Sequence, residues 1–277
     1  VDDDRAYWRL GSTVSTWLEG EEVEELATNA NSFDLGEGRL WIATDAGVDT
    51  IDTVSGDVST VLDSGPYVSI AATDTGVFLS DGPRLWSWDM SGAPEQVYEG
   101  GNLRMRSVGL EALYFVDVER YDAVRLDIAS GEASVVWSAP AEHLHFPGSM
   151  LERESGVFLT DENQVLLISE TGESEVVYAG PPSQRLGAMT KIGDGLLVRD
   201  TASEVSADGS VLVSIELSTQ EARTHSVWPL RNVARLALSG DTLLMSDFES
   251  GVAGNSDASP VGDGIYAVSA CGCNHRR

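Results

Sequence analysis

Six aspartates recur at one place in a repeated motif, and regularly placed carboxylates are a pattern that can hold a metal ion. Each aspartate ends a short apolar segment, such as Leu40-Trp-Ile-Ala-Thr-Asp45. The six residues are Asp45, Asp81, Asp117, Asp161, Asp200 and Asp247. An aspartate at a strand end also accepts hydrogen bonds from backbone N–H groups of the next turn, which holds that turn in place. Because a feature common to every repeat is usually required by the fold, we expect these aspartates to be structural.

The arginines are a second candidate group, because guanidinium groups bind carboxylates and phosphates through paired hydrogen bonds. Six of them lie at or just before segments predicted to be the innermost strands of the repeats: Arg104, Arg106, Arg153, Arg185, Arg231 and Arg235. Arg104 and Arg106 are two residues apart, so a regular strand would place both on one face. They predict a positive pocket for a carboxylate, a phosphate or an acidic peptide. The alternative is that these arginines pair with nearby acids and tie the repeats together.

Histidine and cysteine form two smaller candidate sites. His143 and His145 alternate in one loop, where two imidazoles near carboxylates can bind a metal or transfer protons. Cys271, Cys273 and His275 form a Cys-x-Cys-x-His tail with ligands suited to copper or zinc. The alternatives are an incidental histidine pair and an exposed terminal segment. We therefore predict no bound cofactor and keep a metal ion as the open alternative.

The spacing of the aspartates predicts the fold that positions all these residues. Successive aspartates are 36, 36, 44, 39 and 47 residues apart, a period typical of stacked or radial repeats. Each aspartate is followed by a second apolar segment, then in most repeats by a Ser-Gly or Thr-Gly turn and a third apolar segment. Another apolar segment precedes most of the aspartate strands. Four short antiparallel strands in a repeat of about 40 residues are typical of a β-propeller blade.

The sequence thus predicts an all-β, six-bladed β-propeller of four-stranded antiparallel blades, as a single domain over residues 1–277. The blades are expected at about residues 32–65, 66–101, 102–140, 144–181, 185–229 and 232–270, with a tail at 271–277. The sixth repeat ends after its third strand, and segment 14–20 has the form of a fourth strand. We expect this segment to close the ring as the outer strand of blade six, because closure removes an exposed sheet edge.

One repeat also resembles a known superfamily. The segment Leu113-Tyr-Phe-Val-Asp117 is followed by Ala123-Val-Arg-Leu-Asp127 and by Ser130-Gly131. This pattern resembles the six-bladed TolB-like propellers, especially their YWTD-type repeats. The resemblance implies a propeller fold in which the motif is structural. It leaves the function open, because members of that superfamily bind proteins, bind small ligands or catalyse hydrolysis.

The composition restricts partners and location. The chain has 45 acidic and 17 basic residues, a net charge of −28, which argues against nucleic acid and anionic membrane surfaces as partners. No apolar run approaches the roughly 20 residues that span a bilayer. The chain begins with Val1, and its two cysteines lie in the tail. We therefore expect an extracellular, periplasmic or cell-surface protein whose leader or lipid anchor has been removed.

The leading functional hypothesis is a non-catalytic binding propeller that recognises a protein or a small anionic ligand. Departures from the repeat occur at 20–31, 140–147, 201–209 and 248–263. In a propeller these segments share one face, and binding residues often lie on variable loops held by a rigid scaffold. One alternative is a metal-dependent hydrolase or lyase with its site at the channel mouth. Another is a structural scaffold subunit.

Overall fold

The computed structural model describes residues 5–18, 24–109, 111–140, 148–153, 156–182, 184–200, 211–226, 233–239, 242–247 and 264–269. Within these ranges the protein is all β, with 26 strands in seven antiparallel sheets. Five sheets have four strands and two have three. The described part of the chain contains no helix of the length and apolar character that crossing a membrane requires.

The chain divides into two compact units, residues 1–142 and 143–277, and each is considered by itself. The first unit holds four sheets. They are β1 (Arg5–Leu10), β2 (Thr13–Leu18) and β3 (Glu24–Ala27); β4 (Ala30–Gly36), β5 (Arg39–Thr44), β6 (Val48–Asp52) and β7 (Val58–Leu62); β8 (Ser69–Thr73), β9 (Gly76–Ser80), β10 (Arg84–Trp88) and β11 (Glu95–Glu99); and β12 (Leu103–Val108), β13 (Ala112–Asp117), β14 (Asp122–Asp127) and β15 (Ala133–Ser138).

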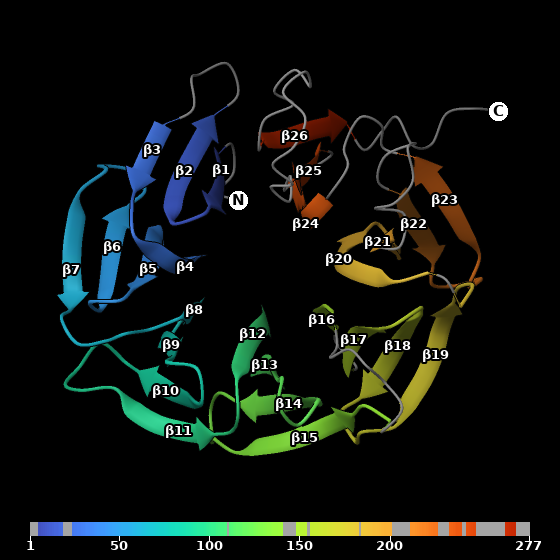
Figure 1. The fold of residues 1–277 in the computed structure, drawn as a ribbon, viewed down its shortest axis with the longest axis horizontal. Helices are drawn as coiled ribbons and strands as arrows, with labels where there is room; N and C mark the ends of the chain where they lie inside the picture. Colours follow the sequence, from blue (N-terminus) through green and yellow to red (C-terminus); the bar gives the residue numbers. More distant parts are fainter. Residues whose placement is uncertain are drawn as a thin grey trace, which may run out of the picture. The chain divides into compact units, whose positions relative to one another are not determined.

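The second unit holds three sheets. They are β16 (Met150–Arg153), β17 (Gly156–Asp161), β18 (Gln164–Ser169) and β19 (Ser174–Ala179); β20 (Leu186–Ile192), β21 (Gly195–Asp200), β22 (Val211–Glu216) and β23 (Ala222–Ser226); and β24 (Val233–Ser239), β25 (Thr242–Asp247) and β26 (Gly264–Ser269). In both units each strand pairs with the next along the chain, so every sheet is a simple meander (Figure 1).

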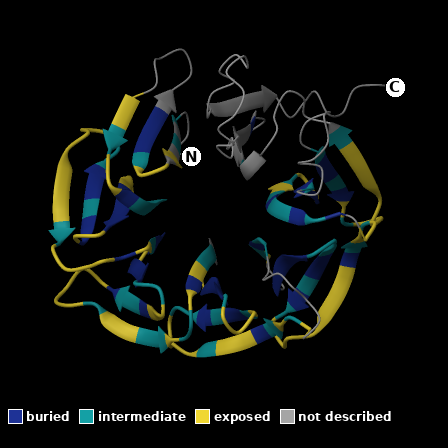
Figure 2. Cartoon of the chain, in the orientation of Figure 1, coloured by how far each residue is buried: buried dark blue, intermediate teal, exposed yellow. Residues whose placement is uncertain are grey.

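Burial changes regularly from the first to the last strand of a sheet. The second strands are continuous apolar runs, and every residue of β9, β13 and β17 is buried. A strand that is apolar on both faces needs packing on both sides, which neighbouring sheets provide. The last strands β7, β11, β15 and β19 are mainly exposed (Figure 2). The outer strands therefore lie at the solvent-facing edge of their sheets, with only a few residues covered.

The core lies between successive sheets. Phe78 of β9 and Leu85 of β10 pack against Phe115 of β13 and Leu126 of β14, and Phe115 is completely buried. In the second unit Phe158 of β17 belongs to a similar cluster that the next sheet completes. First strands of successive sheets also contact each other: β4 contacts β8, and β8 contacts β12 (Figure 1).

The six predicted blades are confirmed as separate antiparallel sheets, each with its aspartate-ending strand in second place. The structure describes four strands in the first five and three in the sixth. The predicted closing strand is not what the structure shows. Both edges of β2 are paired within its own sheet, to β1 and to β3, so segment 14–20 cannot be the outer strand of blade six. Short connections favour pairing between neighbours in sequence, which explains why this segment forms a seventh sheet. The assignment of all sheets to one domain stays a prediction.

Candidate functional site

Asp117 at the end of β13 shows what the repeated aspartate does. Its side chain is completely buried, and its carboxylate accepts a hydrogen bond from the backbone N–H of Gly101 at 3.0 Å. It also accepts hydrogen bonds from the backbone N–H groups of Glu119 and Arg120, each at 3.2 Å. Because Gly101 precedes β12, this one carboxylate joins the start of the first strand to the turn that follows the second.

Other blades use the same connection with different donors. Asp200 at the end of β21 accepts a hydrogen bond from the backbone N–H of Arg185, just before β20, at 3.4 Å. Asp45, directly after β5, accepts one from the Nδ2 group of Asn31 in β4 at 2.8 Å. In the fourth blade Thr160 takes this role, because its Oγ1 accepts the backbone N–H of Ser149 at 2.8 Å.

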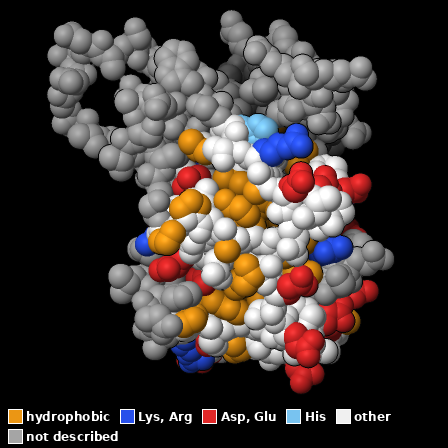
Figure 3. All heavy atoms as spheres, turned by 90° about the vertical axis from the view of Figure 1, so that its right-hand side faces the viewer, with side chains coloured by type: hydrophobic (Ala, Val, Ile, Leu, Met, Phe, Trp, Pro, Cys, Tyr) orange, Lys and Arg blue, Asp and Glu red, His pale blue; other side chains and the backbone are white. Residues whose placement is uncertain are grey.

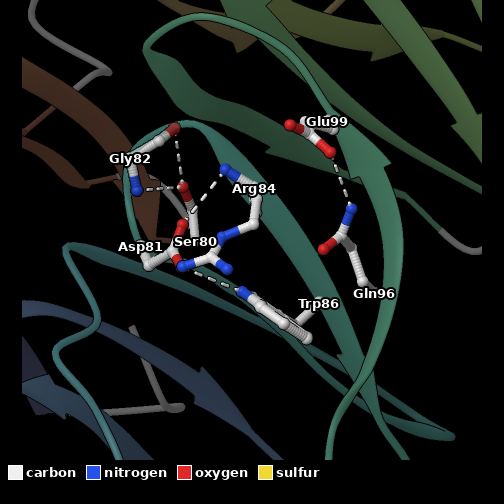
Figure 4. Close-up of polar contacts among 7 residues, drawn as sticks. All are labelled: Ser80, Asp81, Gly82, Arg84, Trp86, Gln96 and Glu99. Carbon is white, nitrogen blue, oxygen red and sulfur yellow. Dashed lines mark hydrogen bonds and ion pairs between the residues drawn. The ribbon is translucent and has the colours of Figure 1, made fainter.

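The carboxylate of Asp81 interacts with residues at the start of the third strand of its blade (Figure 4). Its carboxylate lies 2.6 Å from the Arg84 guanidinium and accepts the backbone N–H of Arg84 at 3.1 Å. It also accepts the indole N–H of Trp86 at 3.4 Å, while the Arg84 guanidinium lies 5.1 Å from the centre of the Trp86 ring. The three side chains therefore hold one another at the start of β10, and the charge of Arg84 is already paired.

The predicted hydrogen bonds from the following turn are confirmed for Asp81 and Asp117. Asp45 and Asp200 are also structural, but they bond to Asn31 and to the backbone N–H of Arg185 instead. Within the described ranges, no three histidine, cysteine, aspartate or glutamate side chains are grouped to hold a metal ion. The side chain of Asp247 lies outside the described residues.

Arg104 and Arg106 lie on β12, the first strand of the third blade. Arg104 is exposed and stands opposite Val116 of β13, whereas Arg106 is half-buried. Met105 stands opposite Phe115 and Ser107 opposite Tyr114, so Arg106 is the additional residue of a β-bulge. A bulge interrupts the alternation of faces along a strand. The two-residue spacing predicted that Arg104 and Arg106 share one face, but the bulge between them means that the register of β12 does not place them on the same face. Both arginines have interactions within the protein.

The structure places Arg153 and Arg185, in the second unit, at different ends of their blades. Arg153 is the last residue of β16, beside the hairpin to β17, and its guanidinium lies 5.5 Å from the centre of the Phe158 ring. Arg185 precedes β20 at the opposite end of its blade, and its Nη1 donates to the carbonyl oxygens of Pro182 and Gln184 at 3.0 and 2.9 Å. These contacts are with an aromatic ring and with carbonyl oxygens, and the pairing with acids that the alternative predicted stays a prediction.

The remaining predicted site residues lie outside the described part of the chain. They are Arg231, His143, His145, Cys271, Cys273 and His275. Arg235 belongs to β24, but its side chain is not among those described. The possible metal sites at the histidine pair and the cysteine tail stay predictions.

Asp34 is a partly buried carboxylate with a shifted pKa, and the sequence analysis did not select it as a candidate site residue. It lies on β4, and its carboxylate accepts the backbone N–H of Ala72 in β8 at 2.8 Å and that of Leu35 at 2.9 Å. Burial raises the pKa of Asp34, while these hydrogen bonds oppose the rise. The carboxylate therefore links the first strands of two consecutive blades. The sequence signal is an aspartate inside a strand, where this residue type is uncommon.

A second residue pair that was missed lies in the fifth blade. The Oγ of Ser214 in β22 and the Nε2 of His225 in β23 are 2.8 Å apart. Arg223 stands directly opposite Ser214 on the neighbouring strand, so these three side chains share one face of the sheet. A guanidinium, a hydroxyl and an imidazole on one face can together contact a carboxylate. The signal in the sequence is a histidine where other blades have an aromatic residue or leucine.

Comparisons with known proteins establish the fold. No family profile and no curated protein sequence matches the chain. A chain of the nidogen/laminin complex is 13% identical with a TM-score of 0.57, and the match covers 85% of this chain and 98% of that one. A catalytically inactive virginiamycin B lyase from Staphylococcus aureus, solved with quinupristin, is 11% identical with a TM-score of 0.64, covering 96% and 88%.

An extracellular domain of a putative one-component system from B. thetaiotaomicron is 10% identical with a TM-score of 0.63. That match covers 88% of this chain and 37% of the other. At such low identity these similarities concern the fold alone. Together with the meander sheets and their repeated aspartate anchor, they show that this chain is a β-propeller.

Proposed function

We propose that this protein is an exported, non-catalytic binding propeller that recognises an acidic segment of a partner protein or a small anionic ligand through β12. The observation that carries the proposal is the presence of two arginines on this strand, Arg104, which is exposed, and Arg106, which is half-buried at the bulge. Bulges redirect side chains and are frequent beside functional sites. An anion is the ligand that guanidinium groups bind best.

The contacts that Arg104 and Arg106 already make do not prevent this function. A guanidinium has five N–H donors, so it can keep an interaction within the protein while it binds an oxyanion. The core of the blade is supplied by the alternate residues, since Met105 packs against the cluster around Phe115. The arginines can therefore be changed at less cost to the fold than their apolar neighbours.

The structural neighbours support binding and an exported location for this chain. One belongs to a complex of two proteins, nidogen and laminin, and another is an extracellular domain. The remaining part of the proposal, recognition of an anionic partner, rests on the chemistry of β12.

The experiment compares the wild type with Arg104→Ala/Arg106→Ala against phosphate, citrate and a polyglutamate peptide, by isothermal titration calorimetry. We expect the affinity for at least one probe to fall about tenfold, the loss of one charge-assisted hydrogen bond. Arg39→Ala is the matched control, because Arg39 is also exposed and in the first unit but lies on a second strand. Unchanged affinities in the double variant, or an equal loss in the control, would refute the role of β12.

The alternative function is a metal-dependent hydrolase or lyase, and it is supported by the similarity to virginiamycin B lyase. Its candidate ligands would be His143 and His145, which lie outside the described residues. Elemental analysis of the purified protein tests it. One bound metal per chain that is lost in His143→Ala/His145→Ala would favour this alternative over the binding propeller. A structural scaffold subunit, the third possibility, predicts no affinity for any of the probes.

A further inference from the structure

The outer edge of the fifth blade differs from the other outer edges in its pairing. The last strands β3, β7, β11, β15 and β19 each carry a β-bulge where they pair with the preceding strand. The inserted residue is always apolar: Leu26, Val61, Val97, Val136 and Val177. In β23 the pairing with β22 is uninterrupted, from Ser226 opposite Val211 to Ala222 opposite Ile215.

This difference has a physical consequence for the unpaired side of the strand. The last strand of a sheet presents a row of backbone N–H and C=O groups that another chain can pair with. A bulge twists the edge and breaks the regular spacing of that row, which protects against such pairing. Among the described last strands of four-stranded sheets, β23 alone lacks this protection. Ala222, Arg223 and Thr224 are exposed.

The charge of β23 also differs from that of the other last strands. Every charged residue on the five bulged strands is acidic: Glu24, Glu25, Glu95, Glu99 and Glu175. The titratable residues of β23 are Arg223 and His225, two positions apart. Figure 3 shows the side of the second unit on which β19 and β23 lie, where histidine and basic atoms adjoin and acidic side chains lie close below them.

His225 occupies a place that is aromatic in other blades. After the inserted valine, β11, β15 and β19 continue with Tyr98, Trp137 and Tyr178, and these face the same third-strand position as His225. Tyr98 packs against Phe115 with ring centres 5.0 Å apart. His225 instead bonds to Ser214, which stands opposite Arg223 on the same face of the sheet. The fifth blade has thus exchanged an apolar anchor and a bulge for a polar, basic face.

We propose that the edge of β23 accepts an extended acidic segment of a partner protein as an additional antiparallel or parallel strand, with alternate carboxylates facing Arg223 and His225. Backbone hydrogen bonds supply affinity in this mode, and alternate side chains supply specificity. Side chains directly opposite on paired strands have Cβ atoms about 5 Å apart, which is within reach of an ion pair. This interaction is independent of the arginines on β12, which belong to the other unit.

The test uses a blocked, fluorescein-labelled peptide of alternating glutamate and valine, and fluorescence anisotropy with the whole protein. Two control peptides replace glutamate by lysine or one central valine by proline, which removes a ladder hydrogen bond. Two protein variants separate charge from edge geometry. Arg223→Glu reverses the charge, and insertion of valine after Thr224 together with His225→Tyr recreates the order of residues seen in β19. Glu175→Arg is the matched control, since it places an arginine on a bulged strand at the position equivalent to Arg223.

We expect the glutamate peptide to bind the wild type, and each of the two β23 variants to weaken it about tenfold or more, by the loss of cross-strand charge pairs or of the regular edge. Glu175→Arg should not gain a second site. Hydrogen exchange should show new protection at residues 222–226 when the peptide is bound. Retained binding in both β23 variants, or binding of the lysine peptide, would overturn the proposal. Sedimentation that shows a dimer abolished by the valine insertion would also overturn it, because the occupant would then be a second copy.

Discussion

Replacing Asp117 by alanine tests most directly whether the repeated aspartate braces the blade. The carboxylate accepts three backbone N–H groups and is completely buried. Loss of the acceptor leaves the partly buried N–H of Gly101 without its partner, at a cost of about 2 kcal/mol. The N–H groups of Glu119 and Arg120 belong to an exposed turn that water can reach, so each should cost about 1 kcal/mol. The variant should therefore lose about 4 kcal/mol of unfolding free energy.

Urea unfolding followed by tryptophan fluorescence measures this change, because Trp41, Trp86 and Trp88 all lie in the same unit as Asp117. With a slope of about 2.5 kcal/mol/M, the midpoint should fall by about 1.6 M. Asp45→Ala is the matched control. Asp45 holds the same place in its blade but is exposed and accepts a side-chain hydrogen bond from Asn31, so its loss should cost less than about 1 kcal/mol. Equal effects of the two substitutions would refute the argument, since burial would then not determine the strength of the anchor.

Two further predictions concern the first unit. Gly100→Ala should destabilise the protein nearly as much as Asp117→Ala, because a Cβ at Gly100 would collide with the Asp117 carboxylate and with the Leu103 side chain; differential scanning calorimetry should show a lower melting temperature, and an unchanged one would contradict the packing. Asp34 should make stability depend on pH. Since burial raises its pKa above the ordinary 3.8, the folded state binds the proton more tightly than the unfolded chain, and its contribution to unfolding free energy falls as the pH rises from about 3.8 through the raised value. Asp34→Asn removes this titration, so urea midpoints measured across that range should improve for the variant relative to the wild type as the pH increases; a constant difference would show that Asp34 does not titrate differently on folding.

Most of the blade structure follows from local patterns. The apolar segment that ends in aspartate predicts a buried second strand, and Ser-Gly turns predict the next hairpin; Gly131 indeed has a φ of 70° after Asp127. The role of Asp117 could be inferred because its turn partners are close in sequence. Its partner Gly101 is not, since that contact forms only when the first and second strands pair.

The candidate site was less predictable because it depends on departures from regular geometry. The spacing of Arg104 and Arg106 indicates one shared face only if the strand is regular, and the bulge at Arg106 cannot be recognised from the residue types. Similarly, segment 14–20 resembles an outer strand in sequence, but β1 pairs with one of its edges and β3 with the other. The three-residue face around His225 required the register between β22 and β23.

The sequence by itself determined the number of aspartate repeats, the strand order within each blade and the excess of acid on the surface, because period, apolar patterning and charge are local properties of the chain. Only the tertiary structure decided which edges are regular, which strands are bulged and which charged groups face one another. The physical reason is that register is a property of two strands together, and one inserted residue changes which side chains meet and which backbone groups stay open to a partner.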